Sequence, residues 1–165
     1  MAGGILPVAR YRGQLFFLFG REVQDGMWSD FGGSREGNET TWQTAMREGS
    51  EELNGFFGSA GDLSKLATKH CVLEINNGGY TTYIFEIDFD KKLPLYFNNN
   101  YRFSRKYLSR EISKKNGLFE KSSISWYTLS EIKRSRKFFR PFYRSILDIL
   151  INNIDEIEKN LKSRE

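Results

Sequence analysis

The sequence is poor in the residues that build disulfide frameworks and imidazole metal sites. Its 165 residues include one cysteine, Cys71, and one histidine, His70. A single cysteine excludes an internal disulfide, and a single histidine excludes a metal centre built from several imidazoles of one chain. We therefore expect a reducing, intracellular setting, the cytoplasm, for this protein. We interpret His70 as a surface or satisfied side chain at the start of a strand.

The sequence also lacks a long apolar run. No stretch has the length that crosses a membrane, and the first residues have neither the basic region nor the apolar core of a signal peptide. We expect no membrane partner. With 39% hydrophobic and 15% aromatic residues the chain can build a core, and its length suits one domain over residues 1–165. The net charge of +4 is mildly basic, but the positive charge is concentrated in the later part of the chain.

The most informative stretch is acid-rich and reads GSREGNETTWQTAMREGSEELNGF at residues 33–56. A helix over residues 41–53, capped by Thr40 or Thr41, places Glu48, Glu51 and Glu52 inside one arc of roughly 100°. Like charges at this spacing destabilise a helix by a few tenths of a kcal/mol per pair. Mg²⁺ and Mn²⁺ prefer oxygen ligands and reverse that repulsion. The pattern therefore predicts a divalent-metal site formed by these three carboxylates.

This stretch resembles the Nudix box, whose pattern is Gly, five residues, Glu, seven residues, Arg-Glu-apolar-any-Glu-Glu-any-Gly-apolar. The positions that match at the right spacing are Gly33, Glu39, Arg47, Glu48, Glu51 and Glu52. Two positions depart from it: Gly49 replaces an apolar residue, and Asn54 replaces the closing glycine. Gly49 should weaken the helix by about 1 kcal/mol relative to alanine. Asn54 can adopt the left-handed conformation that ends a helix.

The resemblance implies an α/β fold, an α/β/α sandwich with a central mixed sheet and a catalytic loop-helix-loop. It implies a metal-dependent pyrophosphohydrolase that uses Mg²⁺ or Mn²⁺ to cleave a phosphoanhydride bond in a nucleoside diphosphate derivative. The implied metal ligands are Glu48, Glu51, Glu52 and the carbonyl group of Gly32. The alternative activity is a catalytically weak nucleotide- or RNA-binding module.

Two further roles follow from the resemblance. Glu39 is expected to pair with Arg47 and support the loop against the helix. The catalytic residues are expected among the box glutamates. As general base we favour Glu51 or Glu48, with Glu120 as the weaker alternative, because the position before Trp126, where an acid is usual, holds Ser125.

Substrate choice depends on residues outside the box, and the candidates for substrate contacts are Arg21, Arg35, Arg102 and Phe103. Basic residues interleaved with aromatic ones at 102–115 and 133–144 suit a polyanion such as capped RNA, although a solvated surface is the alternative interpretation. The segments WSDFGGSRE and FFRPFY resemble Nudix proteins of large DNA viruses, some of which act on mRNA caps, so a host cytoplasm is one expected setting. Dinucleoside polyphosphates, diphosphoinositol polyphosphates and oxidised nucleoside triphosphates also stay open.

The remaining patterns predict the elements around the box. Strands are expected at 4–12, 14–22, 70–75, 80–89 and 124–129, with a turn at Gly13, a hairpin turn at 76–79 and one buried face for 80–89. We expect loop or short helix at 58–69, loop at 91–100, a helix at 101–115 and a short helix that opens at Ser130. A helical stripe at 147–161 is expected to pack on the sheet, and a dimer interface is the alternative. We therefore expect a monomer or a homodimer.

Overall fold

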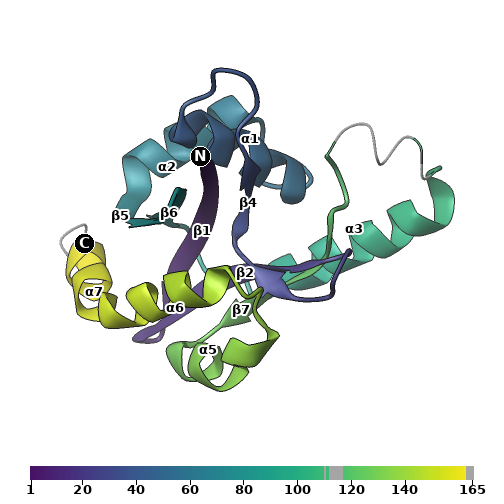
Figure 1. Ribbon diagram of the computed structural model, residues 1–165. Helices are drawn as coiled ribbons and strands as arrows, with labels where there is room; N and C mark the ends of the chain where they lie inside the picture. Colours follow the sequence, from purple (N-terminus) through teal and green to yellow (C-terminus); the bar gives the residue numbers. More distant parts are fainter. Residues whose placement is uncertain (110, 112–116, 163–165) are drawn as a thin grey trace.

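The computed structural model describes residues 1–109, 111 and 117–162, and a mixed sheet forms its centre (Figure 1). The sheet has seven strands, in the order β3-β2-β1-β6-β5, with β4 added to β1 and β7 added to β2. The β1–β6 pair is parallel, and the other pairs are antiparallel. The strands are β1 (Ala2–Tyr11), β2 (Gln14–Glu22), β3 (Trp28–Ser29), β4 (Phe31–Ser34), β5 (Cys71–Asn77), β6 (Tyr80–Glu86) and β7 (Lys121–Tyr127).

Helices cover both faces of this sheet (Figure 1). One face carries α1, α2 and α3, and the other carries α5, α6 and α7. Their bounds are α1 (Thr41–Glu52), α2 (Ala60–His70), α3 (Leu93–Tyr107), α5 (Leu129–Ser135), α6 (Tyr143–Asn152) and α7 (Ile154–Lys162), with a short 3-10 helix η1 (Arg136–Phe138). The architecture is the expected α/β/α sandwich.

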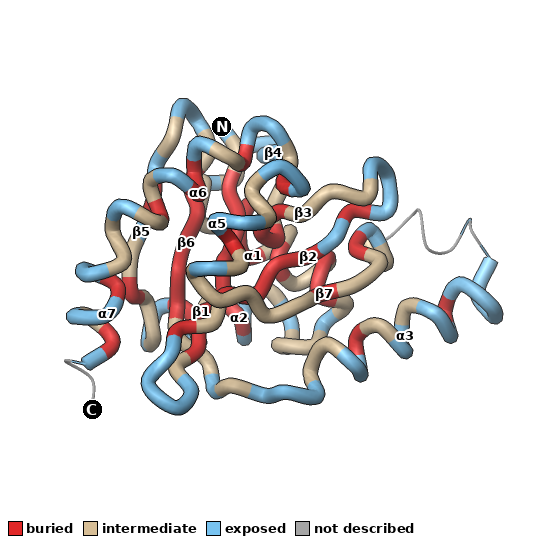
Figure 2. The backbone as a smooth tube through the Cα atoms, turned by 90° about the horizontal axis from the view of Figure 1, so that it is seen from below, coloured by how far each residue is buried: buried red, intermediate tan, exposed pale blue. Residues whose placement is uncertain are grey.

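The two cores follow from alternation along the central strands. On β1, Ile5 faces the core under α1, whereas Leu6 faces the core under α6. On β2, Leu18 faces the first core and Phe17 the second, because successive side chains of a strand point to opposite faces. Both strands are therefore buried on both faces. Figure 2 shows the buried residues gathered in the strands, with α3 reaching out beyond the sheet.

The prediction of one buried face for residues 80–89 is wrong. Strand β6 ends at Glu86, and its inner residues are buried on both faces. Tyr83 and Phe85 pack toward α1, as the alternation indicates, but Ile84 is also fully buried. The reason is that α6 covers the second face, and alternation within one strand does not reveal a distant helix.

The predicted loop at 91–100 is also wrong, because α3 begins at Leu93. Pro94 lies in the first helical turn, where no intrahelical N–H is needed. Phe97 is fully buried, and the Oδ1 atom of Asn98 accepts a hydrogen bond of 3.0 Å from the backbone N–H of Ile124. These contacts outweigh the turn preference of the asparagine run. The predicted helix beyond Ser109 falls outside the described residues, apart from position 111.

Two details of the C-terminal third differ from expectation. The short helix α5 is capped by Thr128 rather than Ser130, and the N3 residue Glu131 completes the capping box. The long helical stretch divides at Asn153, whose backbone N–H bonds back to Ile149 and Leu150. The stripe at 147–161 packs on the sheet as expected. In the described part of the chain, no helix combines the length and apolar character needed to span a membrane.

Candidate active site

Helix α1 carries the acidic cluster and is held tightly against the sheet. Its N-cap is Thr40, one of the two expected candidates, which exchanges hydrogen bonds with Gln43. Gly49 lies on the buried face, where a Cβ atom would come within 2.5 Å of Cδ1 of Ile5. The departure of Gly49 from the box pattern thus has a packing cause, since the helix and β1 approach too closely for a larger side chain.

Arg47 connects the parts of the box. Its guanidinium group donates to both carboxylate oxygens of Glu39, from Nε to Oε1 at 2.8 Å and from Nη2 to Oε2 at 3.2 Å. Its Nη1 atom donates to Glu48 at 3.0 Å and to Glu51 at 3.1 Å, and its Nη2 atom donates to the carbonyl oxygen of Ser34. The hydrogen bonds from Arg47 lower the pKa of Glu39 to about 2. The pairing that the resemblance implies for Glu39 and Arg47 is therefore present.

The three box glutamates differ in their surroundings. Glu48 lies against Gly33, where a Cβ atom would come within 2.5 Å of its carboxylate, and burial raises the pKa of Glu48 despite the opposing effect of Arg47. Glu52 is almost fully buried. Its Oε2 atom accepts a hydrogen bond of 2.8 Å from the N–H of Gly32, and burial raises the pKa of Glu52 well above its ordinary value. Glu51 reaches the side of the cluster nearest to Gly117.

A buried lysine lies beneath this cluster. Lys121 begins β7, and its Nζ atom contacts Oε1 of Glu22, Oγ of Ser29 at 2.9 Å and Oε2 of Glu52 at 3.4 Å. Burial by itself would lower the pKa of Lys121, but Glu52 and Glu22 raise it above its ordinary value. The ammonium group therefore stays charged among these carboxylates.

The end of α1 is tied to the segment that carries Glu120. Asn54 adopts a left-handed backbone with φ of 52°, as expected for a residue that ends the helix. Its Oδ1 atom accepts a hydrogen bond of 2.9 Å from the backbone N–H of Phe119, whereas its buried Nδ2 atom has no hydrogen-bond partner among the residues that the structure describes. Asn54, which replaces the closing glycine of the box, therefore forms a hydrogen bond with Phe119, the residue next to Glu120. Partial burial and the carboxylates of Glu22 and Glu51 raise the pKa of Glu120.

The three box glutamates, Arg47 and Glu120 line one polar cleft with a volume of about 780 Å³. Its ionisable lining residues are Glu22, Glu36, Glu48, Glu51, Glu52, Glu120, Arg47 and Arg140, and its remaining walls include Gly32 and Gly33. Carboxylate oxygens are the donors that Mg²⁺ and Mn²⁺ prefer, so the chemistry of the lining fits such an ion. In their present rotamers, the described residues contain no group of three acidic, histidine or cysteine side chains arranged to hold a metal ion. The box carboxylates face Arg47 and Lys121 instead.

The cleft includes none of the four residues expected to contact substrate. Arg21 donates from Nε to the carbonyl oxygen of Gly26 in its own turn, and Arg35 is exposed beside the cleft residues 34 and 36. Arg102 and Phe103 are exposed on α3. Their roles in substrate binding stay predictions.

Arg140 is one of the cleft residues that the sequence did not single out; Glu22 and Glu36 are others. It lies in the second basic run, and its guanidinium group contacts Glu22 at 3.4 Å and Asp25 at 3.2 Å. Its backbone N–H bonds to the carbonyl oxygen of Trp28, which places it next to β3. No local pattern indicates this position, because it depends on a contact between distant parts of the chain.

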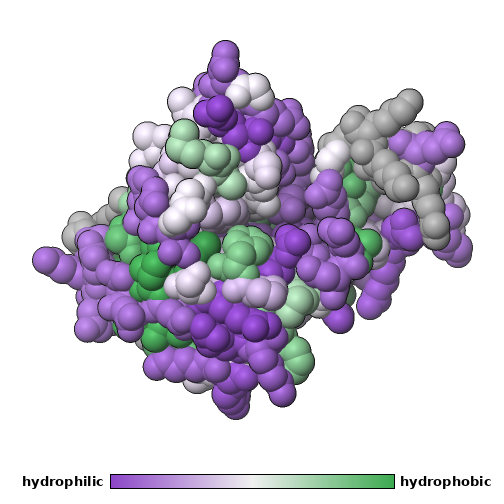
Figure 3. Space-filling view, viewed as in Figure 1, coloured by the Kyte–Doolittle hydropathy of each residue, from purple (hydrophilic) through white to green (hydrophobic). Residues whose placement is uncertain are grey.

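Other members of the basic runs have structural contacts or lie elsewhere. Arg136 forms an ion pair with Asp148 at 2.6 Å, and Arg144 donates to two backbone carbonyl oxygens. In the view of Figure 3, hydrophilic side chains cover most of the face, and hydrophobic ones gather mainly along α6 and α7. The basic positions 110, 114 and 115 lie outside the described residues.

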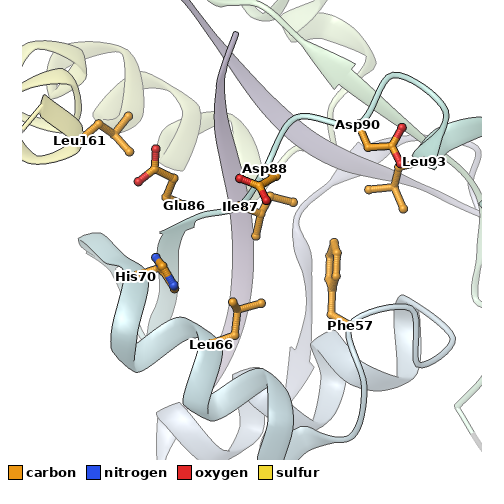
Figure 4. Close-up of a pocket in the computed structure, with 9 residues that line it drawn as sticks. All are labelled: Phe57, Leu66, His70, Glu86, Ile87, Asp88, Asp90, Leu93 and Leu161. Carbon is orange, nitrogen blue, oxygen red and sulfur yellow. The ribbon is translucent and has the colours of Figure 1, made fainter. Parts of the chain in front are cut away.

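A second pocket, of about 480 Å³, shares no lining residue with the cleft. It lies between α2, the end of β6, the start of α3 and α7. Its polar lining consists of His70, Glu86, Asp88 and Asp90, and Figure 4 shows Phe57 and Leu66 pointing into it from the helical side. The single histidine of the chain is therefore half-buried in this pocket, away from the acidic cluster.

Comparison with known proteins establishes the fold. No protein-family model and no curated protein matches the chain. Among solved structures, it is similar to an Ap4A hydrolase of C. elegans, with 16% identity, a TM-score of 0.55 and coverage of 93% of this chain and 96% of that one. It is similar to the Nudix hydrolase RenU of M. smegmatis, with 15% identity, a TM-score of 0.51 and coverage of 93% and 85%.

A third similar structure is a bifunctional NMN adenylyltransferase/ADP ribose pyrophosphatase of Francisella tularensis, with 16% identity and a TM-score of 0.53. The match covers 92% of this chain and 40% of that larger one. These likenesses agree with the resemblance of residues 33–56 to the Nudix box. The chain therefore has the fold of the Nudix hydrolases.

Proposed function

We propose that this protein is a divalent-metal-dependent pyrophosphohydrolase that cleaves a phosphoanhydride bond in a nucleoside diphosphate derivative. The observation that carries the proposal is the cleft at the C-terminal part of α1, where six carboxylates surround one polar space beside Gly32 and Gly33. The fold supports the proposal, because structures that share it include an Ap4A hydrolase and an ADP ribose pyrophosphatase. A further structure of the Francisella protein is complexed with AMP and a Mn ion.

Glu48, Glu51, Glu52 and the carbonyl group of Gly32 are the groups that would hold Mg²⁺ or Mn²⁺. A bound ion of this type neutralises phosphate oxygens and lowers the pKa of water. Arg47 orients two of the carboxylates, because its Nη1 atom bridges Glu48 and Glu51. The guanidinium groups of Arg47 and Arg140 supply positive charge at the wall of the cleft and would face the phosphates of the substrate.

The geometry favours Glu120 as the general base over Glu51 and Glu48. The two box glutamates already accept hydrogen bonds from Arg47, so either carboxylate would have to give up that donor to bind the proton of a water molecule. In the described ranges, no group donates a hydrogen bond to the Glu120 carboxylate, which lines the same cleft. Glu120 would take the proton of the attacking water, and the phosphoanhydride would then break as one phosphate leaves.

The first substrate to test is Ap4A, because the match with the C. elegans Ap4A hydrolase covers nearly all of both chains. ADP-ribose follows from the Francisella structure. Capped RNA is a further candidate substrate, since α3 exposes Arg102, Arg105 and Lys106 together with the aromatic rings of Phe103 and Tyr107. Cations beside exposed aromatic rings form a surface that can bind a single-stranded polyanion.

The test measures phosphate products from Ap4A, ADP-ribose and capped RNA in Mg²⁺ or Mn²⁺. Glu120→Gln should lower kcat by about 10²–10⁴-fold if this carboxylate is the base. Glu51→Gln tests the metal-binding part of the cleft. Glu158→Gln, on the exposed side of α7, is the matched control and should retain wild-type activity. Equal inactivity of wild type, Glu120→Gln and Glu51→Gln on a broad panel would refute the proposal.

A second candidate function is a nucleotide- or RNA-binding module without turnover. It is favoured by one observation: the box carboxylates face Arg47 and Lys121, and the described residues form no ready three-ligand metal group. RNA binding that weakens with salt, persists in Glu51→Gln and occurs without hydrolysis would select this function.

A further inference from the structure

The starting observation is that a charged lysine lies fully buried beneath the cleft. Lys121 has no exposed side-chain surface, and its Nζ atom contacts both Glu22 and Glu52. It also donates a hydrogen bond of 2.9 Å to Oγ of Ser29, itself buried. The desolvation of an ammonium group is costly unless several partners compensate for it. The contacts around Lys121 provide that compensation.

The fold creates a specific place for this side chain. Lys121 lies opposite Glu22 in the antiparallel pairing of β7 with β2. On β2, Gly20 leaves room for the aliphatic part of the lysine side chain, because a Cβ atom at position 20 would lie 2.9 Å from Cδ of Lys121. The ring of Phe31 covers the ammonium group at 5.9 Å. The lysine is therefore enclosed from below, and only its carboxylate partners connect it to the cleft.

Glu52 is the partner that matters for the cleft. Both of its contacts, with the N–H of Gly32 and with Nζ of Lys121, are made through Oε2. A cation already neutralises this oxygen from inside the protein. Glu22, the other partner, also lines the cleft and receives a second positive charge from Arg140.

We propose that the ammonium group of Lys121 replaces one divalent ion in this site, so that the cleft binds one Mg²⁺ or Mn²⁺ fewer than its carboxylates would hold without it. This inference rests on the proposed function, because it concerns the same cleft. Lys121 is a positioning residue: it does not contact the substrate but fixes Glu22 and Glu52 and sets the charge that remains for metal ions. Removal of a fixed cation from between two carboxylates should open that position to a mobile one.

The experiment counts Mn²⁺ ions bound per full-length chain at pH 8, by electron paramagnetic resonance of free Mn²⁺ without substrate. Lys121→Met should bind one Mn²⁺ more than wild type. The additional substitution Glu22→Gln in that variant, at the partner of Lys121 that is not among the ligands of the wild-type ion, should abolish the extra ion. Lys159→Met removes an exposed ammonium group on α7 and should bind the wild-type number.

Lys121→Met removes the buried cation that Glu22 and Glu52 share, so its folding is followed by circular dichroism. If it is unfolded without metal, millimolar Mn²⁺ should restore the folded spectrum. Equal ion counts in wild type and Lys121→Met, or a variant that stays unfolded in Mn²⁺, would overturn the inference. Wild type that binds no Mn²⁺ counts against the proposed function alone if Lys121→Met still gains an ion.

Discussion

Replacement of Asn54 by glycine should separate activity from stability. Asn54→Gly restores the closing residue of the Nudix box, yet it removes the oxygen that accepts the hydrogen bond from Phe119. That hydrogen bond connects the end of α1 to the segment that carries Glu120. We therefore expect the variant to remain folded and to lose activity, because the carboxylate of Glu120 is no longer held over the cleft.

The energies follow from the local contacts of Asn54. Loss of the hydrogen bond to Phe119 should cost about 0.5–1.5 kcal/mol. Removal of the buried Nδ2 atom, which has no partner, should return about 1–3 kcal/mol. Glycine suits the backbone φ of 52° better, by up to about 1 kcal/mol, although its flexible unfolded state offsets much of that gain. The free energy of unfolding should therefore stay within about 1 kcal/mol of wild type or rise.

Two measurements on the same preparations test this expectation. Urea denaturation gives the free energy of unfolding, and Ap4A hydrolysis in Mn²⁺ gives kcat, which we expect to fall about tenfold or more from lost positioning. Asn54→Asp keeps an oxygen for Phe119 and should retain more activity than Asn54→Gly. Wild-type kcat in Asn54→Gly, or a stability loss above about 2 kcal/mol, would refute the reasoning.

Three other predictions follow from the same structure. Gly49→Ala should destabilise the protein by about 1–2 kcal/mol, because overpacking against β1 exceeds the gain in helix propensity. Gly61→Ala, in the exposed first turn of α2, should not destabilise it. Equal effects of the two substitutions in thermal unfolding would contradict the packing argument. Burial raises the pKa of Asp30 to about 6, so the folded protein binds more protons than the unfolded chain between about pH 4 and pH 6. The free energy of unfolding, measured relative to Asp30→Asn, should therefore fall as pH rises through that range, by up to about 3 kcal/mol. A difference independent of pH would contradict this. Arg47 lowers the pKa of Glu39 to about 2, so Glu39→Gln should be less stable than wild type at pH 7. In denaturant unfolding, this difference in stability should disappear as pH falls from about 4.5 toward 2. A difference that persists at pH 2 would show a cause other than the ion pair.

Local sequence determined the acidic helix of this protein. The spacing of Glu48, Glu51 and Glu52 places them on one side of a helix, because helical geometry relates residues three and four apart without help from the rest of the chain. The cap at Thr40 and the pairing of Glu39 with Arg47 also lie within this short stretch. These features are therefore readable from the sequence, together with the two strands that the turn at Gly13 connects.

The tertiary structure alone decided what surrounds that element. Lys121 lies beneath the cleft because β7 pairs with β2, and Arg140 lines the cleft because residue 140 bonds to β3. These contacts span roughly a hundred residues of sequence. Asn54 forms a hydrogen bond with Phe119, and glycine is required at position 49 because Ile5 lies too close for a larger side chain. Local periodicity carries no information about which strands become neighbours or in what register, so the cations beneath the carboxylates emerge only once the chain is folded.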